Sequence, residues 1–188
     1  GIRRIEAITS EKAEKYVNEQ LRILEEIKET FKNPKYLGKR IKELIDENAQ
    51  MKKQIEDFEK EKLTILRNSL RENIEKHGEI NVIAQKVNVN SAASMKDLAF
   101  QLKNQIDNLY MVLGAEISGK ANLSLMISEN LVKEKGLDAG NIIREAAKEI
   151  KGGGGGQPFF ATAGGKNTAG IEKAIHKAVE KMKENNVS

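Results

Sequence analysis

Apolar residues recur at spacings of three and four along the first part of the chain, with charged residues between them. From Ser10 to about Phe31 this pattern predicts one amphipathic helix, and acidic residues in its first turn favour a helix N-terminus. Asn33-Pro34 then ends the helix, because proline disfavours the helical conformation in the residue before it. A second helix is predicted from Pro34 to about Lys76, since proline is well tolerated at a first helical position.

The second helix begins with a heptad pattern that has one polar interruption. Spacings of four and three alternate along the positions Leu37, Ile41, Leu44, Asn48, Met51, Ile55 and Phe58. Heptads are typical of coiled coils, and two helices joined by a short turn are typical of an antiparallel hairpin. The sequence therefore predicts a long helical hairpin, a coiled-coil arm, over residues 10–77. Asn48 either fixes the pairing register or lies in solvent, and the far half of this longer helix needs a further partner.

After Gly78 the pattern changes to short elements. Alternating or continuous apolar runs predict strands, and three- and four-residue spacings predict helices. The strands are expected over 79–89, 109–117 and 121–128, and the helices over 95–108, 129–135, 138–150 and 171–184. Ser94 and Asp138 are the expected N-caps of the helices 95–108 and 138–150. Because this order permits a crossover between parallel strands as well as a hairpin, we expect a mixed sheet. The overall class is α+β or α/β, with a small globular α/β domain over residues 78–188.

The last two predicted helices are separated by the stretch Lys151 to Lys166, K-G-G-G-G-G-Q-P-F-F-A-T-A-G-G-K. Its five consecutive glycines, Gly152 to Gly156, add backbone entropy and nothing to pack, so we expect a loop rather than the interior of a helix or strand. Bare backbone N–H groups suit close approach to an anion, and the following helix N-terminus would favour negative charge. The stretch is either a backbone cradle for phosphate or ribose, or a flexible hairpin that connects two elements.

The composition narrows the possible chemistry. There is no cysteine, and the two histidines, His77 and His176, are far apart, which excludes thiolate sites and argues against a histidine-rich metal site. The formal net charge of +4 divides evenly between the two halves, so bulk charge is weak evidence for nucleic acid. No apolar run approaches the ~18–20 residues of a membrane span and no signal peptide is visible. Because the chain starts with glycine, we expect a fragment of a longer protein.

Motifs of nucleotide hydrolysis and nucleophilic catalysis are missing from the sequence. Gly165-Lys166 is followed by Asn167 rather than serine or threonine, which excludes a Walker A loop. Hydroxyl nucleophiles have no histidine nearby in a catalytic motif. We therefore expect a binding module without catalytic or metal-ligating residues. Phe159 and Phe160 could stack on bases, although at least one of them is expected in the core.

The stretch D-A-G-N-I-I-R-E-A-A-K-E-I, followed by G-G-G-G-G-Q-P-F-F-A-T-A-G-G-K, resembles the C-terminal, tRNA-binding domain of bacterial alanyl-tRNA synthetases. The same domain type is found in the C-terminal part of phosphoesterases of the DHH class. Residues 1–9, G-I-R-R-I-E-A-I-T, resemble the end of the synthetase editing domain, just before its helical linker. The resemblance thus gives three parts: the end of an editing domain (1–9), a helical hairpin arm (10–77) and a globular tRNA-binding domain (78–188).

The resemblance implies a segment of a cytoplasmic ligase that joins alanine to its tRNA with ATP and clears mischarged serine or glycine at a zinc-dependent editing site. Both active sites, with their ATP, magnesium and zinc, would lie upstream, so this segment would be non-catalytic and without a cofactor. Its expected partner is tRNA(Ala), contacted at the elbow, so that aminoacylation and editing act on one tRNA. A homodimer through the arm or the globular domain is a further expectation.

Three residues depart from the family pattern in the glycine stretch. Gln157 stands where a basic residue is usual, Phe159 where aspartate is usual and Thr162 where glutamine is usual. Loss of the basic residue weakens a phosphate contact, whereas adjacent aromatic rings favour stacking on exposed bases. We therefore expect recognition by shape, stacking and backbone N–H groups. The expected RNA-binding residues are Lys151, Gly152, Gly153, Gly154, Gly155, Gly156, Gln157, Pro158, Phe159, Phe160, Gly164, Gly165, Lys166 and Lys173.

Two alternatives to a tRNA-binding appendage stay open at this point. The first is an oligomerisation arm with little direct RNA binding, whose interface would be the apolar seam from Leu37 to Ile74. The second is the C-terminal substrate-binding part of a DHH-class phosphoesterase, which would require metal-binding aspartate and histidine motifs upstream of Gly1.

Overall fold

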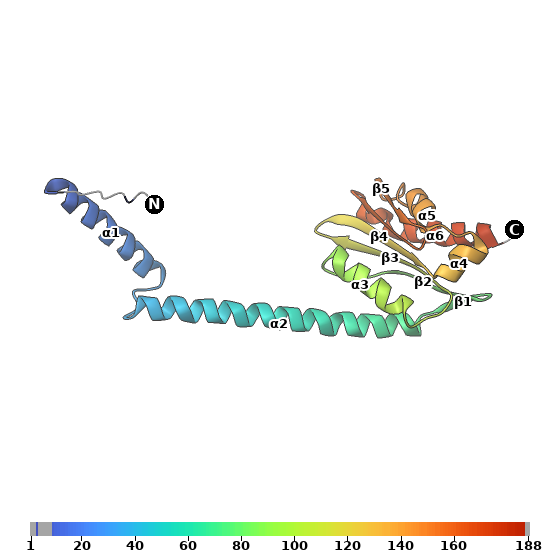
Figure 1. Cartoon of the computed structure of the whole chain (residues 1–188), viewed down its shortest axis with the longest axis horizontal. Helices are drawn as coiled ribbons and strands as arrows, with labels where there is room; N and C mark the ends of the chain where they lie inside the picture. The colour runs from blue at the N-terminus through green and yellow to red at the C-terminus, as the bar shows by residue number, and fades with distance from the viewer. Residues whose placement is uncertain (1–2, 4–8, 187–188) are drawn as a thin grey trace. The chain divides into compact units, whose positions relative to one another are not determined.

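The structure, a computed structural model, describes residue 3 and residues 9–186. The chain forms two compact units, Gly1–Phe58 and Glu59–Ser188. The end of an editing domain expected over residues 1–9 lies almost wholly outside the described residues. Each unit is described separately below, and Figure 1 shows the helices and strands of both.

The first unit consists of two helices whose apolar stripes remain in solvent. Helix α1 spans Glu11–Thr30, and α2 spans Leu37–Glu72, of which the part up to Phe58 belongs to this unit. Between them Lys32 and Asn33 adopt positive φ, which ends α1 before the proline as predicted. Helix α1 has no buried residue, and Phe58 on α2 is 69% exposed. Both helices are thus confirmed, whereas their packing into an antiparallel hairpin is not.

The second unit includes the last part of α2. Leu70 is fully buried, and Leu63 and Leu66 pack against the same core. The change of register after Phe58 therefore marks the point where α2 begins to contact the globular core. For this reason the two units divide between residues 58 and 59, inside α2, whereas the sequence pattern placed the boundary at residue 78.

A mixed sheet of six strands forms the centre of the second unit, with the order β1-β2-β3-β4-β6-β5. Strands β2 and β3 are parallel and every other neighbouring pair is antiparallel, so the predicted mixed sheet is confirmed. The strands are β1 (Glu75–His77), β2 (Ile80–Lys86), β3 (Leu109–Ile117), β4 (Lys120–Ile127), β5 (Gly152–Gln157) and β6 (Phe160–Gly165). Strand β1 was not expected, because the second helix was predicted to continue to residue 76. Gly78, at φ 61°, makes the turn into β2.

Helices cover both faces of this sheet (Figure 1). On one face, α4 (Glu129–Lys135), α5 (Ala139–Ala146) and α6 (Ile171–Asn186) enclose one hydrophobic cluster. On the other face, α3 (Ala92–Lys103) and the end of α2 enclose a second cluster. A short 3-10 turn, Thr168–Gly170, precedes α6. The sheet is therefore the middle layer of three, with a separate core on each side.

Two helix starts show how local chemistry sets the boundaries. Asp138 accepts a hydrogen bond from the backbone N–H of Asn141 at 2.8 Å, which confirms it as the N-cap of α5. Helix α3 is capped by Ser91, whose Oγ accepts from the backbone N–H of Ser94 at 3.0 Å. The expectation of a start at Ser94 was wrong, because two serines at this spacing both suit a cap and only the first has extended backbone.

Candidate functional site

The glycine stretch is a β-hairpin rather than a loop. Gly152–Gln157 form β5, Phe160–Gly165 form β6, and Pro158-Phe159 make the two-residue connection. The expectation that five glycines exclude a strand interior was therefore wrong. At Gly152, Gly154 and Gly156 an added Cβ would come within 3.0 Å of the β6 backbone, so β6 runs too close for any side chain. Glycine loses more backbone entropy on folding than other residues, and this loss is the free-energy cost of the close approach of β5 and β6.

Helix α5 lies alongside the glycine strand and is tied to both of its ends. The backbone N–H of Ala139 donates to Pro158 O at 2.9 Å, and the N–H of Gly152 donates to Ala147 O at 3.0 Å. A Cβ on Gly140 would approach Gly156 O to 3.0 Å, so helix and strand touch backbone to backbone. The outermost strand of the sheet is thus held in place without a single side chain of its own before Gln157.

Three exposed lysines stand at one end of three neighbouring strands. Gly152 pairs with Gly165, so Lys151 and Lys166 flank the open end of the hairpin. Ala121 pairs with Gly165 from the other side, which places Lys120 in the same row. Neighbouring strands lie ~4.8 Å apart, so the row extends over about 10 Å of sheet edge. Charges at this spacing suit the successive phosphates of a nucleic-acid backbone.

The backbone at Lys151 is unusual for its residue type. Its φ is 49°, in the left-handed region that glycine normally occupies after a helix end. A non-glycine residue there costs about 1–2 kcal/mol. The chain thus keeps a lysine at a position that favours glycine, immediately before five glycines.

Aromatic residues gather at the opposite end of the hairpin. The ring of Phe160 packs on that of Phe100 from α3, with centroids 5.2 Å apart, and joins the core on that face. Phe159 is half-buried, and Lys103 Nζ lies 5.1 Å from its ring centroid. Lys103 also forms an ion pair with Glu129 at 2.9 Å, which lowers the pKa of that carboxyl. Phe160 therefore belongs to the core, while Phe159 has a cation over its ring.

The structure separates the expected RNA-binding residues into two groups. Lys151, Gly164, Gly165 and Lys166 lie at one end of the hairpin, and Gln157 to Phe160 at the other. Six residues of strand separate these ends by about 20 Å. Lys173 is exposed in the first turn of α6. The stretch read from the sequence as one continuous site is thus two surfaces that share a strand pair.

Some residues of these surfaces were missed by the sequence pattern. Lys120 follows the Ser118-Gly119 turn, and only the pairing of β4 with β6 brings it beside Lys166. Phe100 and Lys103 appear in the sequence as ordinary positions of an amphipathic helix. No local signal distinguishes these three residues, because their neighbours come from segments about 45 to 60 positions away.

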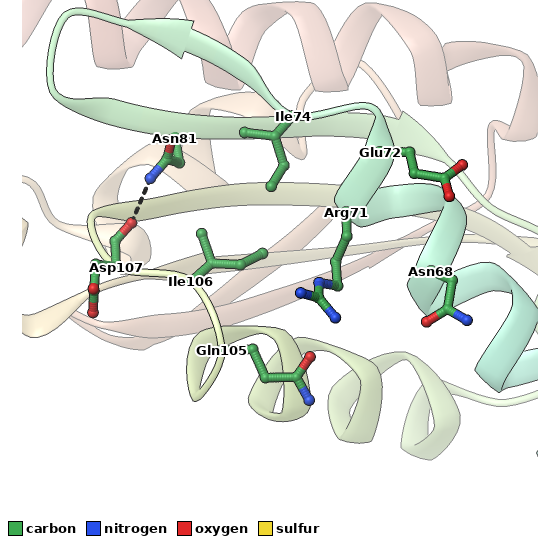
Figure 2. Close-up of a pocket in the computed structure, with 8 residues that line it drawn as sticks. All are labelled: Asn68, Arg71, Glu72, Ile74, Asn81, Gln105, Ile106 and Asp107. Carbon is green, nitrogen blue, oxygen red and sulfur yellow. Dashed lines mark hydrogen bonds between the residues drawn. The ribbon is translucent and has the colours of Figure 1, made fainter.

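A polar cavity of about 640 Å³ lies where the end of α2 meets the connection between α3 and β3 (Figure 2). It is lined by Asn68, Arg71, Glu72, Ile74, Asn81, Gln105, Ile106 and Asp107. Asn81 Nδ2 donates to the backbone oxygen of Asp107 at 2.7 Å, which closes one side. Arg71 supplies the only cation among the lining residues, beside the carboxylates of Glu72 and Asp107. This mixture of charges provides hydrogen-bonding groups without a net attraction for an anion.

Groups suited to metal or acid–base chemistry do not cluster in the described part of the chain. Over residues 9–186 no three histidine, cysteine or carboxylate side chains are arranged to hold a metal ion. Tyr110 is buried with its hydroxyl donating to Ala178 O at 2.6 Å, and burial raises its pKa. That bond ties β3 to α6, which is a structural role. Among the described helices, none is long and apolar enough to cross a membrane.

Comparison with known proteins finds similarity over nearly the whole chain. A family model described as the DHHA1 domain matches residues 79–184. Alanine–tRNA ligase of Christiangramia forsetii is 52% identical over 178 residues, and that of Cytophaga hutchinsonii is 47% identical over 178 residues. Alanine–tRNA ligase of Bacteroides thetaiotaomicron is 46% identical over 181 residues. These matches cover 95–96% of this chain but 20% of each relative, so the chain spans about a fifth of their length.

A solved structure shares the fold of the second unit. The C-Ala domain from Aquifex aeolicus alanyl-tRNA synthetase matches with a TM-score of 0.50 and 24% sequence identity, over 60% of this chain and 96% of that chain. The expected resemblance to alanyl-tRNA synthetases is confirmed by relatives that match the helical part as well as the sheet. With a family model that spans α3 to α6 and the whole sheet except β1, the chain belongs to the DHHA1 domain family.

Proposed function

We propose that this chain is the tRNA-binding C-terminal part of an alanine–tRNA ligase. The observation that carries the proposal is the continuous similarity of nearly the whole chain to alanine–tRNA ligases, at 52% identity to the relative from Christiangramia forsetii. In this proposal the whole protein joins alanine to tRNA(Ala) with ATP and clears mischarged serine or glycine, using magnesium and zinc held elsewhere. The present segment is non-catalytic, has no cofactor and acts in the cytoplasm. The relatives are ligases, which favours this function over a phosphoesterase part.

The proposed contact is the elbow of the tRNA, held so that aminoacylation and editing act on the same molecule. Lys120, Lys151 and Lys166 would bind phosphates, because they form a row of exposed cations at one end of adjacent strands. Phe159, at the far end of the hairpin, would supply a ring face for stacking, whereas Phe160 is engaged with Phe100. Phosphate contacts fix position and stacking adds affinity without a strict sequence requirement.

Salt dependence of tRNA binding tests this proposal. The 188-residue chain is expected to bind tRNA with a negative slope of log K against log salt concentration, of order two to four phosphate contacts. Replacing Lys120, Lys151 and Lys166 by glutamine should weaken binding and reduce the slope by about two to three. The matched control replaces three other exposed lysines, Lys76, Lys133 and Lys135, with the same change in charge. Binding that does not respond to salt, or equal losses in both triple variants, would contradict the lysine row.

Protection of tRNA against chemical cleavage locates the contact. The chain is expected to protect nucleotides of the D- and T-loops, which form the elbow, and to leave the anticodon loop unprotected. Protection limited to the acceptor stem would place the chain elsewhere on the tRNA and overturn the elbow contact.

A second candidate function is oligomerisation through the helical arm, and one specific observation favours it. Apolar side chains that a coiled coil would bury are exposed on α1 and on the first part of α2: Tyr16, Val17, Leu21, Ile23, Leu24, Ile27, Leu44, Ile45, Met51, Ile55 and Phe58. Such a stripe suits a partner helix. The molecular mass in solution tests this function. A chain that is monomeric at all concentrations would exclude oligomerisation of the isolated chain.

A further inference from the structure

The five glycines of β5 are not equivalent. Side chains at Gly152, Gly154 and Gly156 would collide with β6, so the fold itself requires glycine there. At Gly153 and Gly155 an added Cβ would meet nothing within 4 Å, and neither residue has the left-handed φ that favours glycine. Packing against β6 thus explains why three of the five positions are glycine. Neither packing nor backbone conformation requires glycine at the other two, Gly153 and Gly155.

Gly153, one of these two glycines, lines an open hollow. On the same sheet face, Gly153 pairs with Gly164, where an added Cβ would also meet nothing within 4 Å, and Gly155 pairs with Thr162. A cavity of about 300 Å³ lies there, against the first turn of α3. It is lined by Ala92, Met95, Asn122, Leu123, Gly153, Thr162, Ala163 and Gly164. The backbone of Gly153 and Gly164 therefore forms part of its floor, beside Asn122 and Thr162, and its wall is the apolar start of a helix.

An unpaired hydroxyl lies beside this cavity. Ser124 is directly across from Thr162 on β4 and two residues from Asn122, so all three project from the same face of the sheet. Ser124 is 2% exposed, and its Oγ has no hydrogen-bond partner. A buried hydroxyl without a partner is unfavourable by about 1–3 kcal/mol, and such groups are rare in native structures. Together with Thr162 and Asn122 it offers a small set of neutral donors and acceptors.

The cavity lies at the same end of the sheet as the lysine row. Gly153, Gly164 and Asn122 are each two residues from Lys151, Lys166 and Lys120, respectively. None of the eight lining residues is charged. The site therefore combines a neutral, flat-floored hollow with cations at its rim, which matches a nucleotide whose base is buried and whose phosphates are outside. A free phosphate would find no cation inside.

We propose that this hollow binds one unstacked nucleobase, laid flat on the peptide planes of Gly153 and Gly164 against Met95. Thr162, Asn122 and, after a small rotation, Ser124 hydrogen-bond the edge of the base. Unstacked bases of RNA loops are commonly held in this way, between a flat surface and a few polar groups. The inference deepens the proposed function, on which it rests where the base belongs to tRNA. A free nucleoside supplies the same chemistry.

Filling the hollow tests the proposal. Gly153→Leu places a side chain into open space and raises the strand preference of the residue, so the fold is expected to persist. This variant should bind tRNA at least tenfold more weakly than the unaltered chain. The control is Gly38→Leu in α2, where an added Cβ likewise meets nothing within 4 Å. Unchanged tRNA affinity in a folded Gly153→Leu chain would overturn the proposal.

A second measurement does not depend on that variant. Adenosine, guanosine, cytidine and uridine are added separately to the 188-residue chain, and the backbone amide resonances are followed. At least one nucleoside should shift the amides of Gly153 and Gly164, and Thr162→Val should reduce that shift. Absence of any shift at these two amides with all four nucleosides would overturn the nucleobase site.

The two proposals fail separately. If the chain does not bind tRNA but a nucleoside shifts the amides of Gly153 and Gly164, the proposed function fails and the nucleobase site stands for a free nucleoside. If tRNA binds with the expected salt slope but Gly153→Leu binds equally well, the proposed function stands and the nucleobase site fails.

Discussion

The two parts of helix α2 have the same kind of apolar pattern and opposite environments. Ile55 and Phe58, in the first unit, are 58% and 69% exposed, whereas Leu70, in the second unit, is fully buried. The spacing of apolar residues shows that each part has a face to bury, because the helical period places them on one side. It does not show what will cover that face. Only the second unit has a sheet close enough to do so.

The largest expected difference between the two units comes from Leu70→Ala. Leu70 is fully buried in the core between α3 and the sheet, so its loss should lower the free energy of unfolding of the second unit by about 2–5 kcal/mol. Hydrogen exchange of the Val112 amide in central strand β3 measures that free energy. A loss below about 1 kcal/mol would mean that α2 packs on the sheet only loosely, and the contrast between its two parts would disappear.

Gly154→Ala tests whether the close packing of the second unit reaches its outermost strand. The added methyl would overlap Thr162 O and Ala163 of β6, so a cost of about 1–3 kcal/mol is expected. The matched control is Gly155→Ala in the same strand, where the methyl meets open space. That control should be neutral or more stable by about 0.4–1 kcal/mol, since alanine restricts the unfolded chain. Chemical denaturation of both variants decides, and equal effects would contradict the close approach of β5 and β6.

Ile55→Ala provides the counterpart to Leu70→Ala on the same helix. Because Ile55 is 58% exposed, its truncation should change the stability of the chain by no more than about 0.5 kcal/mol. Thermal unfolding followed by circular dichroism measures the change. A loss as large as that of Leu70→Ala would show that the apolar stripe of the first unit is buried in solution, as the oligomerisation hypothesis requires.

The smallest effect is expected at the ion pair between α3 and α4. A hydrogen bond from Lys103 lowers the pKa of Glu129, and Lys133 adds a weaker contribution. A lowered folded-state pKa means that the pair adds stability above the unfolded-state pKa, and that this is lost as pH falls through the folded-state value. NMR titration should find that Lys103→Met raises the pKa of Glu129 more than Lys133→Met does. An equal rise in both variants would show that the hydrogen bond is not the main cause.

Sequence reasoning went furthest where the signal is local and periodic. It predicted α1, most of α2, the central strands β3 and β4 and the Asp138 cap of α5, each of which depends on residues close together in the chain. It failed at β1 and at both strands of the glycine hairpin, β5 and β6. Strand β1 contains no apolar alternation, and β5 consists of glycines, which have low strand preference. Pairing with a neighbouring strand overrides that preference in both cases.

In the candidate site, too, local features were predicted from the sequence and contacts between distant segments were not. The glycine stretch was found from its sequence, together with Lys151, Lys166 and the two phenylalanines. Their arrangement in space was not predicted. The hairpin places Lys151 and Phe159 at opposite ends, and the partners of Phe160 and Lys166 come from α3 and β4. The cavity beside Gly153 could not be found at all from the sequence, since it depends on where α3 begins relative to the sheet.

The sequence by itself determined which segments form helices and central strands, that the family is one found in alanyl-tRNA synthetases, and that glycines Gly152 to Gly156 are unusual. Only the tertiary structure decided that packing requires glycine at alternate positions of this strand and not at the positions between them. Along a strand, successive residues point to opposite faces, so Gly154 meets the backbone of β6 while Gly153 lines a hollow beside the start of α3. A run of identical residues in the sequence does not reveal that difference, because it arises from the neighbouring residues on each face of the strand.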